Sequence, residues 1–256
     1  MKKKSIISLF SILFIFCFAF QASADSAQSW YCKRQKNHTR PCAEPSMTFI
    51  EDQNGFYIGN DPEEKVIYLT FDAGYENGNV ERILDTLKKH EAEGAFFILE
   101  NLIERNPDLV RRMKDEGHLI CNHTAHHKDM TKLSESEIEA EIRALETVYA
   151  EKIGGELAPF YRPPEGKFDK ESLAVAKKLG YYTAFWSLAY ADWDNNKQPD
   201  PAYAKQLLTD HLHNGAVILL HPTSKTNADI LDSLLTEWKA AGYRIGSLNE
   251  FTENCK

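Results

Sequence analysis

Residues 66–78 read VIYLTFDAGYENG, an apolar run that ends on the carboxylate of Asp72 and is followed by small and polar residues. A short apolar segment bounded by turn residues is typical of a buried strand in a parallel sheet, so we expect a strand over residues 65–71. A carboxylate at the end of such a strand is either a turn residue that accepts backbone N–H groups or a group with a chemical role. Asp72 is therefore the first candidate site residue.

Apolar runs alternate with segments of helical periodicity along the rest of the chain. Further strands are predicted at residues 95–99, 118–121, 160–161, 181–186, 216–220 and 243–245. Helices are predicted at residues 79–90, 107–117, 169–179, 201–212 and 228–240, and a long helix opens at Ser134. Parallel strands need such crossover helices, and about seven alternations favour an α/β barrel over a doubly wound open sheet.

The first 24 residues predict export. A basic start precedes an apolar run over residues 6–20, and Ala22-Ser23-Ala24 supplies the small residues of a cleavage point. An uncleaved membrane anchor is the alternative, but a spanning helix needs about 18 or more apolar residues and this run is shorter. We therefore expect a signal peptide over residues 1–24, cleavage near Ala24, a secreted or extracytoplasmic protein, and no stable membrane anchor.

The mature chain predicts one domain with an arm in front of it. Residues 25–61 are polar with scattered aromatic side chains, which indicates an arm that lies across the main domain at residues 62–256. Cys32 and Cys42 share this polar arm and are the candidate disulfide, whereas Cys121 lies on an apolar run and suits a buried thiol.

The charge of the chain argues against nucleic acid as a partner. The formal net charge of -8 becomes -11 once the three lysines of residues 1–24 are removed, and the remaining basic residues are scattered. A nucleic-acid-binding protein needs a basic patch or stripe, which this sequence does not predict.

Polar clusters follow several of the predicted strands, at the end where barrel enzymes build their active sites. His123 and His127 flank three residues, a spacing that can bring two imidazoles to one metal ion or can simply lie on a hydrated turn with His126. The clusters are CNHTAHH at residues 121–127, YRPPEG at residues 161–166, WSLAYADW at residues 186–193 and LLHP at residues 219–222.

Each cluster also has an ordinary structural explanation. Arg162 could be a surface cation, His221 a satisfied core histidine, and Asp192 the partner of a surface lysine. The chain lacks a catalytic site only if every one of these explanations is correct and Asp72 is also just a turn residue. Their joint placement after successive strands favours a catalytic site.

Taken together, these motifs resemble those of the NodB-type polysaccharide deacetylases, carbohydrate esterases of family 4 that remove acetyl groups from glycans. The resemblance covers about residues 65–251 and implies a distorted (β/α) barrel, the NodB homology domain. Five motifs follow the family's order: Thr70 to Gly74, His123-Thr124 with His127, Arg162 with Pro164 and Gly166, Asp192-Trp193, and Leu219-Leu220-His221.

The resemblance implies a role for each matched residue. Asp72 would take a proton from the attacking water, and Arg162 would orient the carboxylate and keep it ionised. The backbone N–H of Glu165 would face the developing oxyanion. His221 would protonate the leaving amine, with Asp192 holding its imidazole in the charged form.

Ala73 departs from the family pattern, which usually has a third metal ligand, an aspartate, at this position. A water or Asp72 could fill the position, the metal could bind only with substrate, or metal chemistry could be absent. The branch that makes muramic δ-lactam in spore cortex resembles this chain around TFDAGYENG and around KRQKNH at residues 33–38. We therefore expect a divalent metal, zinc before other ions, with His123 and His127 as its only side-chain ligands.

The resemblance implies an exported amide hydrolase acting on linear amides of a cell-wall glycan. The expected substrate is N-acetylmuramic acid in peptidoglycan, on the route to muramic δ-lactam in sporulation. Tyr75 and Trp193 are candidates for stacking on sugar rings, and we expect a monomer. The alternatives are a deacetylase of N-acetylglucosamine or chitooligosaccharides and a catalytically silent glycan-binding protein.

Overall fold

The computed structural model describes residues 26–253 of the 256-residue chain. The signal peptide expected over residues 1–24 lies outside the described residues, as does Cys255. Within residues 26–253, no helix combines the length and the apolar character that a membrane span requires.

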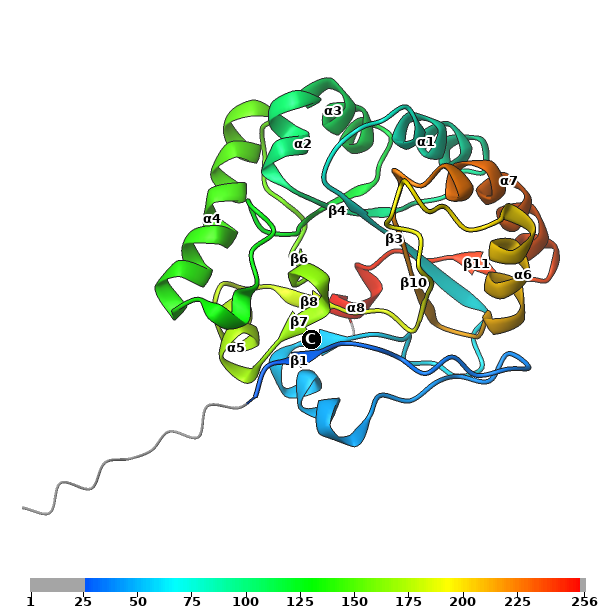
Figure 1. The fold of residues 1–256 in the computed structure, drawn as a ribbon, viewed down its shortest axis with the longest axis horizontal. Coiled ribbons are helices and arrows are strands. Elements are labelled where there is room, and N and C mark those ends of the chain that lie inside the picture. The colour runs from blue at the N-terminus through cyan, green and yellow to red at the C-terminus, as the bar shows by residue number, and fades with distance from the viewer. Residues whose placement is uncertain (1–25, 254–256) are drawn as a thin grey trace, which may run out of the picture.

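A curled sheet of parallel strands forms the centre of the molecule (Figure 1). The strand order is β2-β8-β6-β5-β4-β3-β10-β9, with β2 and β9 at the two edges, and every pair in this sheet is parallel. The strands are β2 (Gly55–Phe56), β3 (Val66–Ala73), β4 (Ala95–Ile98), β5 (Leu119–Asn122), β6 (Phe160–Tyr161), β8 (Tyr182–Ala184), β9 (Leu188–Ala189), β10 (Ala216–Leu220) and β11 (Arg244–Ile245). Strand β11 pairs with the start of β3, on the side opposite β10, because Ile67 pairs with both.

Helices surround the outside of this sheet (Figure 1). They are α1 (Asn79–Lys89), α2 (Glu100–Arg105), α3 (Pro107–Asp115), α4 (Glu135–Lys152), α5 (Lys170–Lys178), α6 (Pro201–His211), α7 (Lys225–Ala240) and the short α8 (Glu250–Glu253). Helix α1 shows the cause of this arrangement, since the apolar residues at helical spacing, Ile83, Leu84 and Leu87, are all buried. The predicted α/β barrel is confirmed, in a distorted and open form.

Local sequence signals explain where several helices begin. Ser134 and Glu137 form a complete capping box at the start of α4. The Asp200 carboxylate accepts the Tyr203 N–H at the start of α6, where Pro201 occupies the first turn. The Ser224 hydroxyl accepts the Asn227 N–H and starts α7 at Lys225, three residues before the predicted start.

Two strands of the sheet and one short helix were missed from the sequence. Strands β2 and β9 have two residues each, too few to show a period, and β2 lies within the polar arm. Helix α2 has six residues, and Asn106 separates it from Pro107 and α3, because the residue before a proline disfavours the helical conformation.

The N-terminal arm follows the edge of the sheet (Figure 1). Its strand β1 (Gln28–Ser29) pairs antiparallel with β7 (Lys167–Phe168), and a 3₁₀ segment, η1 (Pro45–Gln53), leads into β2. Two further 3₁₀ segments, η2 (Met130–Lys132) and η3 (Pro164–Gly166), lie elsewhere in loops.

The expected disulfide between Cys32 and Cys42 is wrong for this structure, in which both side chains are free thiols. Burial, with a smaller contribution from Cys42, raises the pKa of Cys32 to about 12. A shared polar loop therefore brought the two cysteines near each other without bonding them. Cys121 is a free buried thiol, as expected.

Candidate active site

The polar clusters of the sequence meet in one cleft at the carboxyl ends of the parallel strands. The cleft has a volume of about 1380 Å³, larger than the roughly 300–1,000 Å³ of a site for one small molecule. Arg162 and Asp192 lie fully buried behind the cleft wall. The predicted site residues that line the cleft are Asp72, Tyr75, His123, His127, Glu165, Trp193 and His221.

Arg162 holds Asp72 in place at the end of β3. The Arg162 guanidinium donates to Asp72 Oδ1 at 2.7 Å, to Thr70 Oγ1 at 2.9 Å and to the carbonyl of Ala184 at 2.8 Å. Its carbon centre stacks 4.1 Å from the Phe97 ring. Because planar guanidinium donors fix the direction of each hydrogen bond, the carboxylate has one orientation, with Oδ2 left for the cleft.

The charges around Asp72 decide its protonation. Burial alone would raise the pKa of Asp72, but the Arg162 cation, with His123 and His221, outweighs burial and holds the pKa below its usual value. Asp72 is therefore an anion at neutral pH.

A network behind the cleft holds the turn that carries the histidines. The Asn122 side chain accepts from Thr124 N at 2.8 Å and donates to the carbonyl of Ile142 in α4 at 3.0 Å. The Thr124 hydroxyl then accepts from His127 N at 3.0 Å. Thr124 and His127 have positive φ angles of 71° and 56°, uncommon for residues with a side chain, and such backbone strain is found most often at functional sites.

The histidines of this turn face in different directions. His123 is buried, and its Nδ1 donates to the carbonyl of Arg162 at 2.8 Å, which leaves Nε2 3.5 Å from Asp72 Oδ2. The His127 ring lies 5.0 Å from the His123 ring. His126 is exposed and instead contacts Glu141 of α4 at 3.1 Å.

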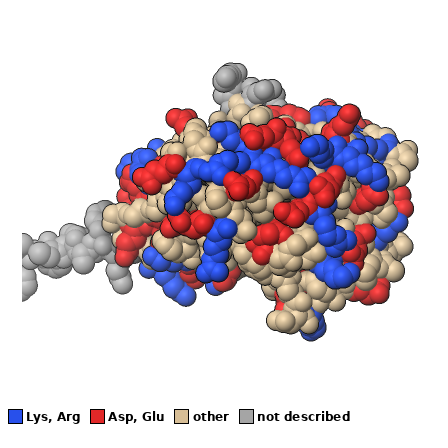
Figure 2. All heavy atoms as spheres, turned by 90° about the horizontal axis from the view of Figure 1, so that it is seen from above, with Lys and Arg blue, Asp and Glu red and all other residues tan. Residues whose placement is uncertain are grey.

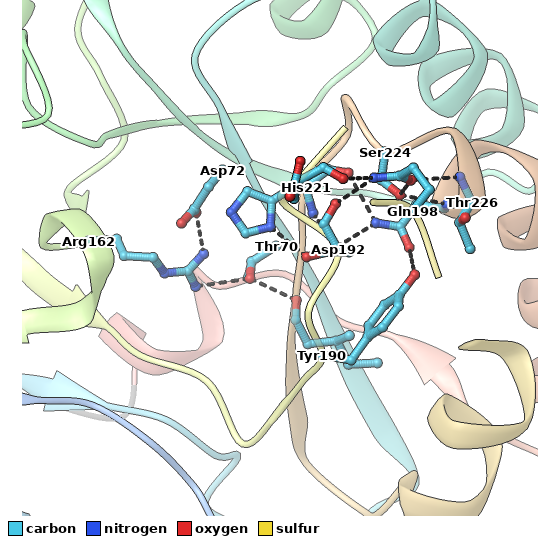
Figure 3. A network of polar contacts seen from close by, with 12 residues as sticks. Thr70, Asp72, Arg162, Tyr190, Asp192, Gln198, His221, Ser224 and Thr226 are labelled. Carbon is cyan, nitrogen blue, oxygen red and sulfur yellow. Dashed lines mark hydrogen bonds and ion pairs between the residues drawn. The ribbon is translucent and has the colours of Figure 1, made fainter. Parts of the chain in front are cut away.

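A second acid–histidine pair lies on the other side of Asp72 (Figure 3). Asp192 accepts from His221 Nδ1 at 2.7 Å and from His221 N at 2.8 Å. Burial opposes the charge on His221, but Asp192 outweighs this effect, so the pKa of His221 is raised above its usual value. The cleft thus presents an anionic carboxylate and, opposite it, an imidazole that is readily protonated.

Comparison with known proteins identifies the family. Residues 59–184 match the sequence profile described as polysaccharide deacetylase. The chain is 43% identical over 225 residues to peptidoglycan-N-acetylmuramic acid deacetylase PdaA of Bacillus subtilis, an alignment that covers 87% of this chain and 84% of PdaA.

The chain belongs to the polysaccharide deacetylase family. The solved structure of B. subtilis PdaA, a family 4 carbohydrate esterase, is similar with a TM-score of 0.86 at 39% identity and covers 90% of this chain and 98% of that one. A family 4 pseudoenzyme from Bacillus anthracis is also similar, with a TM-score of 0.71 at 27% identity, covering 77% of this chain and 68% of that one. The resemblance inferred from the motifs is confirmed, and the protein is a polysaccharide deacetylase.

Deacetylases of this family are generally metal-dependent, and the histidine turn fits part of a metal site. Burial lowers the pKa of His123 to about 4, so its ring is neutral, and the bond from Nδ1 to a carbonyl leaves the Nε2 lone pair for a ligand. Among residues 26–253, no group of three or more His, Cys, Asp or Glu side chains is arranged to hold a metal ion. The deacetylase therefore offers two imidazoles, from His123 and His127, and an incomplete ligand set.

Ala73 does not contribute to the cleft. Its side chain is fully buried in the apolar core, and the neighbouring residues Asp72 and Gly74 line the cleft in its place. The methyl group has no donor atom, so the position leaves the two histidines as the candidate side-chain ligands.

Glu165 lies in a tight turn beside the cleft. Its φ is 57°, and the following Gly166 has φ of 64°. A Cβ on Gly166 would lie 2.7 Å from the Trp186 ring, so only glycine fits this turn. The Glu165 carboxylate pairs with Lys167 Nζ at 2.6 Å. The role of the Glu165 backbone N–H stays a prediction.

Two parts of the site, one in the cleft and one behind its wall, were missed from the sequence. One is the arm segment of residues 30–34, which lines the cleft. The other is Asn227 in α7, which is 1% exposed. Its side-chain NH₂ donates to Asp192 Oδ2 at 2.6 Å and to the carbonyl of His221 at 3.0 Å. Its side-chain oxygen accepts a hydrogen bond from the Tyr190 hydroxyl. The only signal for Asn227 was a polar residue directly before the predicted helix at residues 228–240.

We expect Asn227→Ala to loosen Asp192 and so to lower the pKa of His221 toward its ordinary value. Hydrogen bonds to charged groups are worth about 1.5–3 kcal/mol, so kcat/KM at neutral pH should fall about 10- to 100-fold. If His221 gives a proton to the leaving group, as the family resemblance implies, the alkaline limb of the pH profile should move to lower pH.

Tyr190→Phe is the matched control for this change. It removes only the hydroxyl that donates to Asn227 and should shift the alkaline limb less than Asn227→Ala does. An unshifted limb in folded Asn227→Ala protein would show that Asn227 does not position the acid–histidine pair.

Proposed function

We propose that this deacetylase removes N-acetyl groups from N-acetylmuramic acid residues of peptidoglycan. The observation that carries the proposal is the anionic Asp72, bound by Arg162, opposite a His221 whose pKa is raised by Asp192. Amide hydrolysis needs such a pair, because one group must take a proton from water and another must give a proton to the leaving amine. The similarity to PdaA, a peptidoglycan-N-acetylmuramic acid deacetylase, supports the substrate.

In this proposal each residue has one task. Asp72 accepts the proton of the attacking water, and Arg162 keeps the carboxylate ionised and oriented. The Glu165 backbone N–H faces the oxygen that becomes negative. His221 then donates its proton to the amine, and Asp192 keeps the imidazole charged until that step.

A divalent metal, with zinc the proposed ion, would be held by His123 and His127. Such a metal lowers the pKa of a bound water and polarises a carbonyl oxygen. The neutral His123 ring and the nearby His127 ring support this assignment.

Aromatic side chains at the rim of the cleft support a glycan substrate. Among the described residues, four large aromatic side chains are strongly exposed, and Tyr31, Tyr75 and Trp193 of these line the cleft. Exposed rings beside a cleft can stack on the apolar faces of sugars. We propose Tyr75 and Trp193 as substrate-binding residues, with Tyr31 as an addition from the arm.

The proposal also covers where the protein acts and which later reaction uses its product. Peptidoglycan lies outside the cytoplasmic membrane, which agrees with the expected cleavage of residues 1–24 and with secretion. We propose that the protein acts as a monomer. Removal of the acetyl group frees an amine near the lactyl group of the same sugar, which is the substrate that muramic δ-lactam formation in sporulation requires.

Two alternatives are compatible with the same site and fold. A deacetylase of N-acetylglucosamine would use the same acid–base pair on a sugar without a lactyl group. A silent glycan-binding protein is the second alternative, because a pseudoenzyme of family 4 has a similar fold.

Mass spectrometry of muropeptides, after treatment with purified protein of residues 25–256 and added zinc, tests the proposal. We expect loss of acetyl groups from muramic acid and release of acetate. Asp72→Asn should cut the rate by about 10²–10⁴-fold, because an amide cannot accept the proton. Loss of acetyl from glucosamine alone, or no acetate release at all, would favour the first or the second alternative.

We expect His123→Ala to lower zinc affinity and activity together, because one of only two imidazole ligands is removed. Calorimetric titration of zinc measures the affinity without turnover. His126→Ala is the matched control, since His126 lies in the same turn but faces Glu141, and it should retain both properties. Parental zinc affinity in folded His123→Ala protein would exclude His123 as a ligand.

A further inference from the structure

A segment of the N-terminal arm forms one wall of the active-site cleft. Trp30, Tyr31, Cys32, Lys33 and Arg34 all line the cleft. This segment precedes residues 59–184, which match the family's sequence profile. The arm therefore adds side chains to the cleft that the matched part of the family does not supply.

The arm segment is fixed to the body of the protein at both ends. Trp30 is 4% exposed. Its backbone N–H donates to the carbonyl of Gly166, and its ring N–H donates to the carbonyl of Trp186, both at 2.8 Å. At the other end, His211 Nδ1 donates to the carbonyl of Gln35 at 2.7 Å. Side chains between these anchors are held at a constant place relative to the acid–base pair.

The two cations of this segment are the uncompensated charges of the cleft wall. The carboxylate of Asp72 is paired with Arg162, and that of Glu165 with Lys167. Lys33 makes no ion pair with any of residues 26–253, and neither does Arg34. Arg34 donates one N–H to the carbonyl of Ala189 at 3.0 Å, which leaves the other donors of its guanidinium for a ligand.

This positive wall differs from the rest of the molecule. The chain has a formal net charge of -8, and on the face shown in Figure 2 acidic and basic side chains are interspersed. Two unpaired cations at a cleft that otherwise has paired carboxylates therefore indicate a ligand that carries a negative charge near the reacting group.

We propose that Lys33 and Arg34 bind the lactyl carboxylate of the muramic acid residue that is deacetylated. The inference rests on the proposed function and specifies how the substrate is distinguished. The lactyl carboxylate is the group that muramic acid has and glucosamine lacks. A guanidinium fork matches a carboxylate, and an ammonium adds a point charge beside it.

The position of Arg34 links this recognition to the chemistry. The Ala189 carbonyl, which accepts a hydrogen bond from Arg34, lies at the end of β9. The chain continues from there to Asp192, which pairs with His221. A carboxylate held by Arg34 is thus fixed relative to the proton donor. When the lactyl group is instead an amide, as it is where a peptide is attached, it carries no charge and loses this contact.

The test compares three substrates with the double variant Lys33→Gln/Arg34→Gln. The substrates are a muramic-acid-containing oligosaccharide with free lactyl carboxylates, the same oligosaccharide with the carboxylates converted to amides, and a chitooligosaccharide. Lys36→Gln is the matched control, because Lys36 is an exposed lysine of the same arm that does not line the cleft.

We expect the parent protein to prefer the free carboxylate and the double variant to lose about 10- to 100-fold in kcat/KM on that substrate alone. Its rates on the amidated oligosaccharide and on the chitooligosaccharide should equal those of the parent, and Lys36→Gln should behave as the parent does. A double variant that keeps the parental preference would overturn the proposal.

A binding measurement separates this proposal from the proposed function. In an Asp72→Asn background, calorimetry reads the affinity for the carboxylate oligosaccharide without turnover. Weaker binding after the Lys33 and Arg34 changes supports carboxylate recognition even if no acetate is ever released, an outcome that would reject only the proposed function. Equal affinity with and without the two cations overturns the carboxylate site.

Discussion

The buried ion pair between Arg162 and Asp72 is the interaction on which the rest of the site depends. Arg162 has no exposed surface, and its guanidinium bonds to Asp72, Thr70 and the carbonyl of Ala184. The Arg162 carbonyl accepts a hydrogen bond from His123 Nδ1. Through its guanidinium and its carbonyl, this one residue joins the ends of β3, β5, β6 and β8. Because an unpaired buried charge costs several kcal/mol, only a sheet that brings these strand ends together can bury Arg162.

This constraint also explains the electrostatics of the cleft. Asp72 is ionised although it is mostly buried, because the cation that neutralises it comes from behind the wall and leaves the cleft side open. His221 shows the opposite case, in which Asp192 behind the wall favours the protonated imidazole. In both halves a buried partner of opposite charge sets the protonation of a cleft residue, which is anionic at Asp72 and readily protonated at His221 (Figure 3).

Much of the fold and of this site could be predicted because the signals are local. The apolar run of β10 gave the bounds of that strand, Ala216–Leu220, and the helical period of α1 gave its buried face. Most of the predicted site residues line one cleft because the clusters that carry them follow successive strands. Asn227 escaped notice because its partner Asp192 is 35 residues away, and only the packing of α7 against the sheet brings them together. The contact between the predicted arm and the cleft was missed for the same reason, because tertiary structure makes it.

The measurement that tests the central claim most directly is the rate of acetate release by Arg162→Lys. Lysine keeps the positive charge beside Asp72, but it cannot also bond to Thr70 and to the Ala184 carbonyl with fixed geometry. If Arg162 positions Asp72, the folded variant, checked by thermal unfolding, should lose about 100-fold or more in kcat, since such positioning is a large part of catalysis. A folded Arg162→Lys protein with near-parental kcat would contradict the account, because it would show that the charge alone is enough.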